Sequence, residues 1–273
     1  MENIVTKHYS NDDLEAKIYD GFKKKGIARK DITVEDLAIV DEFHIGGVEA
    51  TSLLIEKLPI LPSSHLLDIG CGIGGPARYI ADSKDCKIDG IDITADYIKT
   101  GNGLTKQVGL SNKVCLTQGS ALKTPFQDQQ FDVSYMMHVG MNISDKNALM
   151  KEVFRVTKSG GIFGIYDVML TGHGDMRYPV PWSESESGSA ISTSYTYKEA
   201  LKQAGFNISY EKSEKDFALT FFNKMLNNIN TAHPRPALGL HLLMGPNTQM
   251  KIKNMAQLVL GDVILPTFLI ATK

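Results

Sequence analysis

The sequence predicts an α/β fold whose sheet is mostly parallel. From residue 64 to about 170, short apolar runs alternate with helical patterns, which is typical of parallel strands joined by crossover helices. The first apolar run, 66–69, leads into four glycines within six positions. Such a bare turn between a strand and a helix lets a ligand lie directly against the backbone. The chain has 273 residues, 42% of them hydrophobic, which is ample for one large domain or one domain with a cap.

Residues 1–60 precede the predicted sheet, and we expect them to form a helical cap over its ligand-binding edge. Polar residues at 11–13 open a helix that runs to about Lys25, with apolar residues on one face. Thr33 begins a second helix, and residues 50–58 form a third. The cap is therefore the first of two predicted domains.

Residues 61–273 form the second predicted domain, a core with two insertions. A lid spans 170–192 after the fifth strand, and an added segment at 230–256, much of it rich in Pro, Gly, His and Met, precedes the last strand. The regular elements expected after the lid are a helix at 193–205, a strand at 208–211, a helix at 217–229 and a strand within 263–272.

An acid in front of the glycine turn indicates which ligand it holds. Asp68 lies two residues before Gly70, in a pattern Asp-x-Gly-x-Gly-x-Gly that continues through Gly72 and Gly74. A carboxylate there can accept hydrogen bonds from an ammonium group, whereas it would repel a pyrophosphate. S-adenosylmethionine carries an ammonium, a carboxylate and a sulfonium but no phosphate. The turn therefore favours this ligand over a dinucleotide.

The next two strand ends supply further ligand contacts. Asp92, followed by Ile93, lies 18 residues after Gly74, near the spacing expected for a carboxylate that grips a ribose. Its alternative role is to cap the helix that begins at Thr94. Small residues after the third strand would leave room for a flat adenine ring, with an ordinary turn as the alternative: Gly119, Ser120 and Ala121.

Together these motifs resemble the class I S-adenosylmethionine-dependent methyltransferases, over about residues 44–273. Residues 130–135 resemble the fourth strand of that family, and 155–165 resemble its "R-V-L-K-P-G-G" helix end, turn and fifth strand, with Ser159 where proline is usual. The resemblance implies a Rossmann-like, seven-stranded, mostly parallel sheet whose last strand is antiparallel and inserted between strands five and six, with helices on both faces. It also implies an enzyme that converts S-adenosylmethionine to S-adenosylhomocysteine.

Residues after the fourth strand are candidates for the chemistry. Met137 and His138 would lie near the sulfonium and its methyl group, because ligands bind outside the carboxyl ends of parallel strands. A histidine there can accept a proton near neutral pH, or it can contact the cofactor or pack against it. Asn142 is expected to orient a substrate, with a helix cap as the alternative.

The predicted lid carries two aromatic side chains. Tyr178 and Trp182, the only tryptophan, are separated by a loop that two prolines stiffen. These rings are expected to build an apolar or cation-π wall around the methyl acceptor. The alternative is a purely structural plug.

The cap also resembles part of the small-molecule N-methyltransferases of the sarcosine/dimethylglycine and phosphoethanolamine type. The run 43–47 resembles the segment just before their core, which implies that His44 and Gly46 contact the methionine end of the cofactor. Tyr9 stands where the phosphoethanolamine enzymes carry a tyrosine that closes over the site and pairs with a histidine after strand four. Asn142 takes that histidine's place here. His138 and Tyr9 are therefore the predicted catalytic residues.

Composition limits the partners. The net charge is −2, with acids and bases interspersed, which argues against a large nucleic-acid footprint. Three cysteines without metal spacing indicate a reducing compartment, and neither a signal peptide nor a 20-residue apolar run is visible. We expect no metal, a cytoplasmic monomer or homodimer, and a small-molecule substrate.

Four functions remain open at this stage. The leading hypothesis is methyl transfer to a small soluble acceptor, in particular an amine nitrogen. The second is methylation of a quinone or isoprenoid ring, because the chain also resembles the ubiquinone/menaquinone methyltransferase-like group. A nicotinamide oxidoreductase and a non-catalytic cofactor-binding module are the alternatives from other classes. The identity of the acceptor, and whether nitrogen, oxygen or carbon is methylated, stay open.

Overall fold

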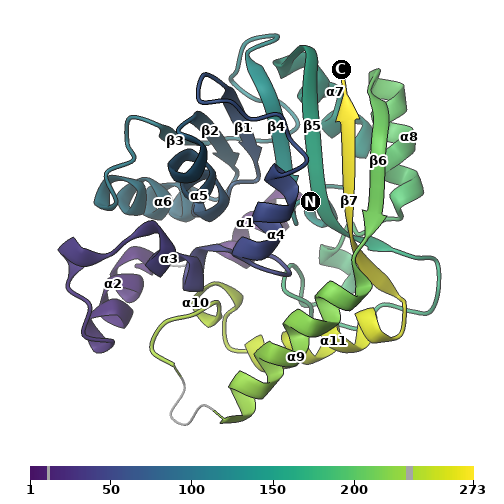
Figure 1. Ribbon diagram of the computed structural model, residues 1–273. Helices are drawn as coiled ribbons and strands as arrows, with labels where there is room; N and C mark the ends of the chain where they lie inside the picture. The colour runs from purple at the N-terminus through teal and green to yellow at the C-terminus, as the bar shows by residue number, and fades with distance from the viewer. Residues whose placement is uncertain (11–12, 232–235) are drawn as a thin grey trace.

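The structure is a computed structural model that describes residues 1–10, 13–231 and 236–273. Its strands form one seven-stranded sheet in the order β3-β2-β1-β4-β5-β7-β6, in which β7 alone runs antiparallel to its neighbours (Figure 1). The strands are β1 (His65–Ile69), β2 (Lys87–Asp92), β3 (Val114–Gln118), β4 (Phe131–Met137), β5 (Thr157–Leu170), β6 (Asn207–Ser213) and β7 (Ile264–Thr272). The predicted fold class, with its antiparallel strand between strands five and six, is confirmed.

Helices cover both faces of this sheet. One face packs on α4 (Val48–Ile55), α5 (Gly75–Lys84) and α6 (Ala95–Gln107), and the other packs on α7 (Lys146–Val156) and α8 (Ser194–Ala204). The inner strands β1, β4, β5 and β7 are therefore buried on both sides and are largely apolar, whereas the edge strand β6 is mostly exposed.

The turn from β1 to α5 depends on its glycines. Gly70 has a φ of +69°, and a Cβ atom there would lie 2.4 Å from the side chain of Val139. At Gly75, a Cβ atom would lie 2.2 Å from the carbonyl oxygen of Asp41. These close approaches bring both the end of β4 and the cap against the turn.

The first 60 residues are helical, as predicted. They form α1 (Glu2–Tyr9), α2 (Leu14–Lys24), a 3-10 turn η1 (Arg29–Asp31), α3 (Val34–Asp41) and α4. Thr33 caps α3 through a reciprocal pair of hydrogen bonds with Asp36. Residues 11 and 12, where the first expected helix was predicted to open, lie outside the described residues.

The segment before β7 is more regular than the sequence indicates. After α9 (Lys215–Thr231), the chain forms α10 (His241–Met244) and the 13-residue helix α11 (Thr248–Leu260), which packs beside α9 (Figure 1). These helices and the cap lie along the carboxyl edge of the parallel strands. In the described residues, no helix is both long and apolar enough to cross a membrane.

Candidate functional site

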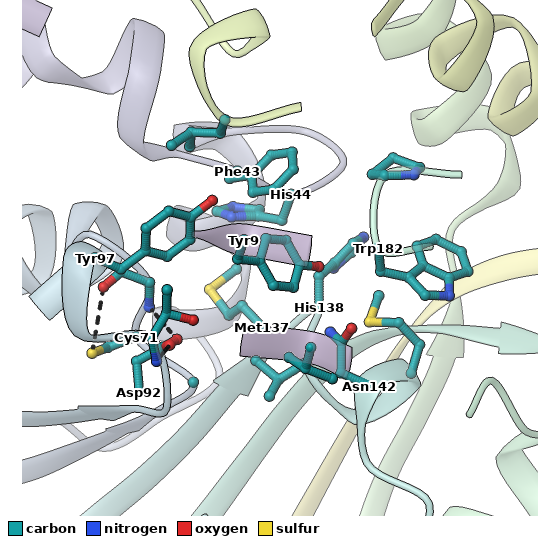
Figure 2. Close-up of a pocket in the computed structure, with 18 of the residues that line it drawn as sticks. Tyr9, Phe43, His44, Cys71, Asp92, Tyr97, Met137, His138, Asn142 and Trp182 are labelled. Atoms are coloured by element: carbon teal, nitrogen blue, oxygen red, sulfur yellow. Dashed lines mark hydrogen bonds between the residues drawn. The ribbon is translucent and has the colours of Figure 1, made fainter. Parts of the chain in front are cut away.

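A cavity at the carboxyl edge of the sheet has a polar half and an apolar half (Figure 2). The polar half is lined by the β1–α5 turn and the ends of β2 and β3, including Asp68, Gly70, Gly72, Asp92, Ile93, Gly119 and Ala121. The apolar half is lined by side chains from the 3-10 turn η2 (Gly140–Asn142), the lid, α9, α10 and α11, including Met141, Trp182, Phe221, Met225, Met244 and Met255. Met137 and His138 lie at the cavity wall too.

The Asp92 carboxylate accepts hydrogen bonds from two backbone segments of the polar half. Its Oδ2 accepts the backbone N–H of Gly72 at 3.0 Å, and its Oδ1 accepts that of Thr94 at 2.8 Å. Burial raises the pKa of Asp92, and these N–H groups oppose the rise. The carboxylate therefore fixes the glycine turn and the residue that precedes α6, and it lines the cavity.

Asp68 lacks a partner for one of its oxygens. The side chain is buried, and Oδ2 makes no hydrogen bond to any described residue. Burial raises the pKa of Asp68 to about 7; the nearby Tyr135 phenol opposes the rise, and the charge of Asp92 adds to it. A cationic hydrogen-bond donor in the cavity would satisfy this carboxylate, which is what an ammonium group supplies.

The cap contributes a buried polar network behind the cavity wall. Thr51 Oγ1 donates to Glu42 Oε2 at 2.7 Å, and His44 Nε2 lies 3.3 Å from the same carboxyl oxygen. His44 Nε2 also lies 3.0 Å from the carbonyl oxygen of Gly47, which only accepts, so this nitrogen carries the hydrogen. Burial lowers the pKa of His44 to about 4, and the imidazole is neutral near pH 7.

Both ring nitrogens of His138 form hydrogen bonds with backbone groups. Its Nδ1 donates to the carbonyl oxygen of Tyr166 at 3.3 Å, and its Nε2 accepts the N–H of Ile45 at 3.4 Å. Burial holds the pKa of His138 well below its usual value. Its left-handed backbone, with φ +55°, aims the ring at this junction. These contacts favour the packing alternative over the predicted catalytic base.

Tyr9 brings α1 over the cavity. Its phenol lies beside the Asn142 side chain (Figure 2), and a hydrogen bond with Asn142 opposes the strong rise that burial causes in the pKa of Tyr9. The neighbouring His8 contacts the lid, with its Nε2 2.9 Å from the carbonyl oxygen of Pro181. The structure therefore pairs Tyr9 with Asn142, the residue that the resemblance placed opposite it.

Most of the predicted site residues meet at this cavity, and four do not line it. His44, Met137, Asn142 and Trp182 join those already named, whereas Gly46, Gly74, Ser120 and Tyr178 are absent from the lining. Tyr178 packs against the apolar cluster of the lid and α11 instead. The roles of all these residues remain predictions.

Several residues at the site were not identified from the sequence. Arg78 is fully buried, and its guanidinium donates to Asp41 at 2.7 Å and to the carbonyl oxygen of Ile73 at 2.7 Å. It therefore ties α3 to the glycine turn. Tyr97 and the apolar faces of α9 and α11, which line the cavity, and Glu42, which lies behind its wall, were missed as well, because only the tertiary fold brings them together.

Residues 67–165 match the family model described as a methyltransferase domain. This segment contains the glycine turn, Asp92 and the ends of β3 and β4. The chain therefore carries a methyltransferase domain in this segment, and the predicted class of S-adenosylmethionine-dependent methyltransferases is confirmed for it.

Curated relatives cover part of the chain. It is 31% identical over 169 residues to sterol 24-C-methyltransferase erg6 of Aspergillus fumigatus, a match that spans 60% of this chain and 45% of that protein. It is 32% identical over 161 residues to methyltransferase phqN of Penicillium fellutanum, spanning 57% and 49%. The chain thus spans less than half the length of these relatives.

Solved structures match the fold over nearly the whole chain. A geranyl diphosphate C-methyltransferase from Streptomyces coelicolor superposes with a TM-score of 0.72 at 16% identity, covering 99% of this chain and 97% of that one. Phosphoethanolamine N-methyltransferase 2 of Haemonchus contortus gives 0.72 at 19% identity, covering 94% and 60%. At these identities the likeness concerns the fold alone.

Proposed function

We propose that this protein transfers the methyl group of S-adenosylmethionine to a small, largely apolar acceptor. The observation that carries the proposal is one continuous cavity, which joins the acids of the glycine turn to a wall of aromatic and methionine side chains. The methyltransferase domain at 67–165 and the sterol 24-C-methyltransferase relatives support it.

The residues of the polar half fit this cofactor. The unpartnered oxygen of Asp68 would accept its ammonium, Asp92 its ribose hydroxyls, and the small residues Gly119 and Ala121 would border its adenine. When bound, it supplies an electrophilic methyl group on a sulfonium, and the electron pair of the broken C–S bond stays on sulfur. Met137 and His138 line the wall where acceptor and methyl group would meet, and a dry wall favours a reaction that neutralises the sulfonium.

The apolar half favours the isoprenoid-type alternative over a charged amine. A protonated amine beside Met141, Trp182 and Phe221 would bury an unpaired charge, which is costly. Long, flexible methionines suit an extended apolar ligand. The names of the sterol and geranyl diphosphate relatives agree with an apolar acceptor.

We also propose the cap at 1–60 and the core at 61–273, with a lid at 170–192 and an added segment at 230–256, as functional units. All three cysteines are free thiols, which supports a reducing, cytoplasmic setting. Monomer or homodimer, a small-molecule substrate and no nucleic-acid partner remain our predictions.

Two measurements test the proposed function. Calorimetry with S-adenosylmethionine, S-adenosylhomocysteine and NADH should give binding of both adenosyl compounds and none of NADH; the reverse would sink the assignment. Transfer of a tritiated methyl group should then be screened over sterols, isoprenoids, quinones, amines and phosphobases. Labelling of the amines or phosphobases alone would overturn the apolar acceptor but leave methyl transfer intact.

A further inference from the structure

Asn142 carries a buried carbonyl oxygen without a partner. The residue is 8% exposed and lines the cavity, and its Oδ1 makes no hydrogen bond to any described residue. An unsatisfied amide oxygen in an apolar setting destabilises the protein, because it has lost its hydrogen bonds to water. Because the oxygen is at the cavity wall, a ligand can recover that cost by donating a hydrogen bond.

The neighbours of Asn142 do not donate a hydrogen bond to its Oδ1, so a bound ligand can do so. Its neighbours along the wall, Met141, Ile143 and Trp182, offer no donor there, since the indole N–H of Trp182 is bonded to Ser189 Oγ at 2.9 Å. The Tyr9 phenol lies beside the Asn142 side chain, yet Oδ1 has no hydrogen-bond partner among the described residues. The carbonyl oxygen is what remains for an incoming molecule.

The charge of the wall limits what that molecule carries. Among the residues that the structure describes, no lysine or arginine side chain lines this cavity, whereas the acids Glu2, Asp41, Asp68 and Asp92 do. Lys251, which lines an adjoining pocket, is already paired with Glu184 at 2.8 Å and with the carbonyl oxygen of Met244 at 3.0 Å. A phosphate or carboxylate on the acceptor would therefore meet several acids and no lysine or arginine side chain of the described residues.

We infer that the methyl acceptor is an uncharged, mostly apolar molecule that donates one hydrogen bond, from a hydroxyl or N–H group, to Oδ1 of Asn142. The inference rests on the proposed methyl transfer and adds a chemical class and a specificity residue to it. It separates this site from one built for geranyl diphosphate or phosphoethanolamine, both of which carry phosphate.

The test uses Trp182, which is the only tryptophan and lines the cavity. Its fluorescence is followed, with saturating S-adenosylhomocysteine, on addition of farnesol, farnesyl methyl ether, farnesyl diphosphate, cholesterol and cholesteryl methyl ether. In the native protein, at least one alcohol should bind about tenfold or more tightly than its ether, a difference of about 1.4 kcal/mol, and farnesyl diphosphate should bind no better than the ether. Asn142→Leu should bring the alcohol-to-ether ratio close to one, and the matched control Asn147→Leu, on the exposed side of α7, should keep it.

Three results would overturn the inference: ether or diphosphate binding as tightly as the alcohol, no binding of either alcohol, or an unchanged ratio in Asn142→Leu. The native protein alone decides the first two, so a poorly folded variant does not block the test. Calorimetry of S-adenosylhomocysteine binding distinguishes failure of the proposed function from failure of the inferred acceptor class. Failure to bind it sinks the proposed function, whereas binding without an alcohol preference sinks only the acceptor class.

Discussion

The two halves of the cavity are constructed differently. Most of the polar half is made from backbone groups and two acids in the stretch 66–94, which Asp92 bonds to itself, and the end of β3 adds Gly119 and Ala121. The apolar half is made from side chains on α1, η2, the lid, α9, α10 and α11, which are far apart in the sequence. A local motif therefore builds the cofactor half, whereas the acceptor half depends on how distant elements pack. Substitutions in the acceptor half should therefore alter which acceptor binds without changing the affinity of the cofactor half for the cofactor.

The largest expected effect comes from the ion pair beneath the polar half. Asp41→Ala leaves the Arg78 guanidinium buried and unpaired, so the free energy of unfolding should fall by about 3–5 kcal/mol. Urea unfolding measures this. The control is Asp20→Ala, which removes an exposed pair with Lys24 and should cost less than about 1 kcal/mol. Equal effects of the two variants would show that the polar half is not rigidly anchored.

Asp92→Ala should weaken S-adenosylhomocysteine about 100-fold, or about 2.7 kcal/mol, because the glycine turn loses a fixed acceptor and the ribose its partner. Isothermal calorimetry measures the affinity. Asp82→Ala, on the exposed side of α5, serves as the control and should bind normally. Unchanged affinity in Asp92→Ala would remove this residue from the site.

Phe221→Ala tests the independence of the apolar half. Its ring lines the cavity from α9, so farnesol affinity should fall about tenfold through lost apolar contact. The affinity for S-adenosylhomocysteine should not change. A drop in both affinities would mean that the two halves of the cavity are coupled, and it would contradict their expected independence.

The smallest effect is a pH dependence of stability from Glu42, which lies between the halves. Burial, with the charge of Asp41 adding, raises the pKa of Glu42 to about 8, while Thr51 and Arg78 oppose the rise and Asp68 adds to it. The folded protein thus keeps a proton that the unfolded chain loses, and this stabilisation is lost as pH rises through about 8.

Urea unfolding at pH 7 and 9 should therefore show a loss of about 1 kcal/mol in the native protein. Glu42→Gln keeps the size of the side chain and cannot ionise, so its loss should be smaller. His44 faces the same carboxyl group, but its lowered pKa acts on the acid side and leaves this interval unaffected. An equal loss in the variant would assign the effect to another group.

The same contrast explains what the sequence predicts well. The strand-helix alternation, the glycine turn and Asp92 follow from short-range patterns, and the structure contains each of them. The Arg78–Asp41 pair joins residues 37 positions apart, and it forms only because Gly75 lets α3 approach the turn. No local pattern carries that information.

The acceptor half was harder for the same physical reason. The added segment predicted at 230–256 contains a glycine and a proline just before residue 248, but packing against α9 makes 248–260 a helix. In the lid, Trp182 enters the cavity while Tyr178 packs elsewhere. Which of two nearby rings faces a ligand depends on the path of the loop, and that path is determined by its tertiary neighbours.

The position of β7 has a consequence for how the chain folds as it is made. β7 lies between β5 and β6, and β6 has no other neighbour in the sheet. Until residues 264–272 leave the ribosome, β5 and β6 each present an unpaired edge. Strands β1–β5 and the cofactor half can assemble on the nascent chain. A chain without residues 264–272 would therefore expose an open, aggregation-prone sheet edge beside a cofactor half that the earlier strands can form.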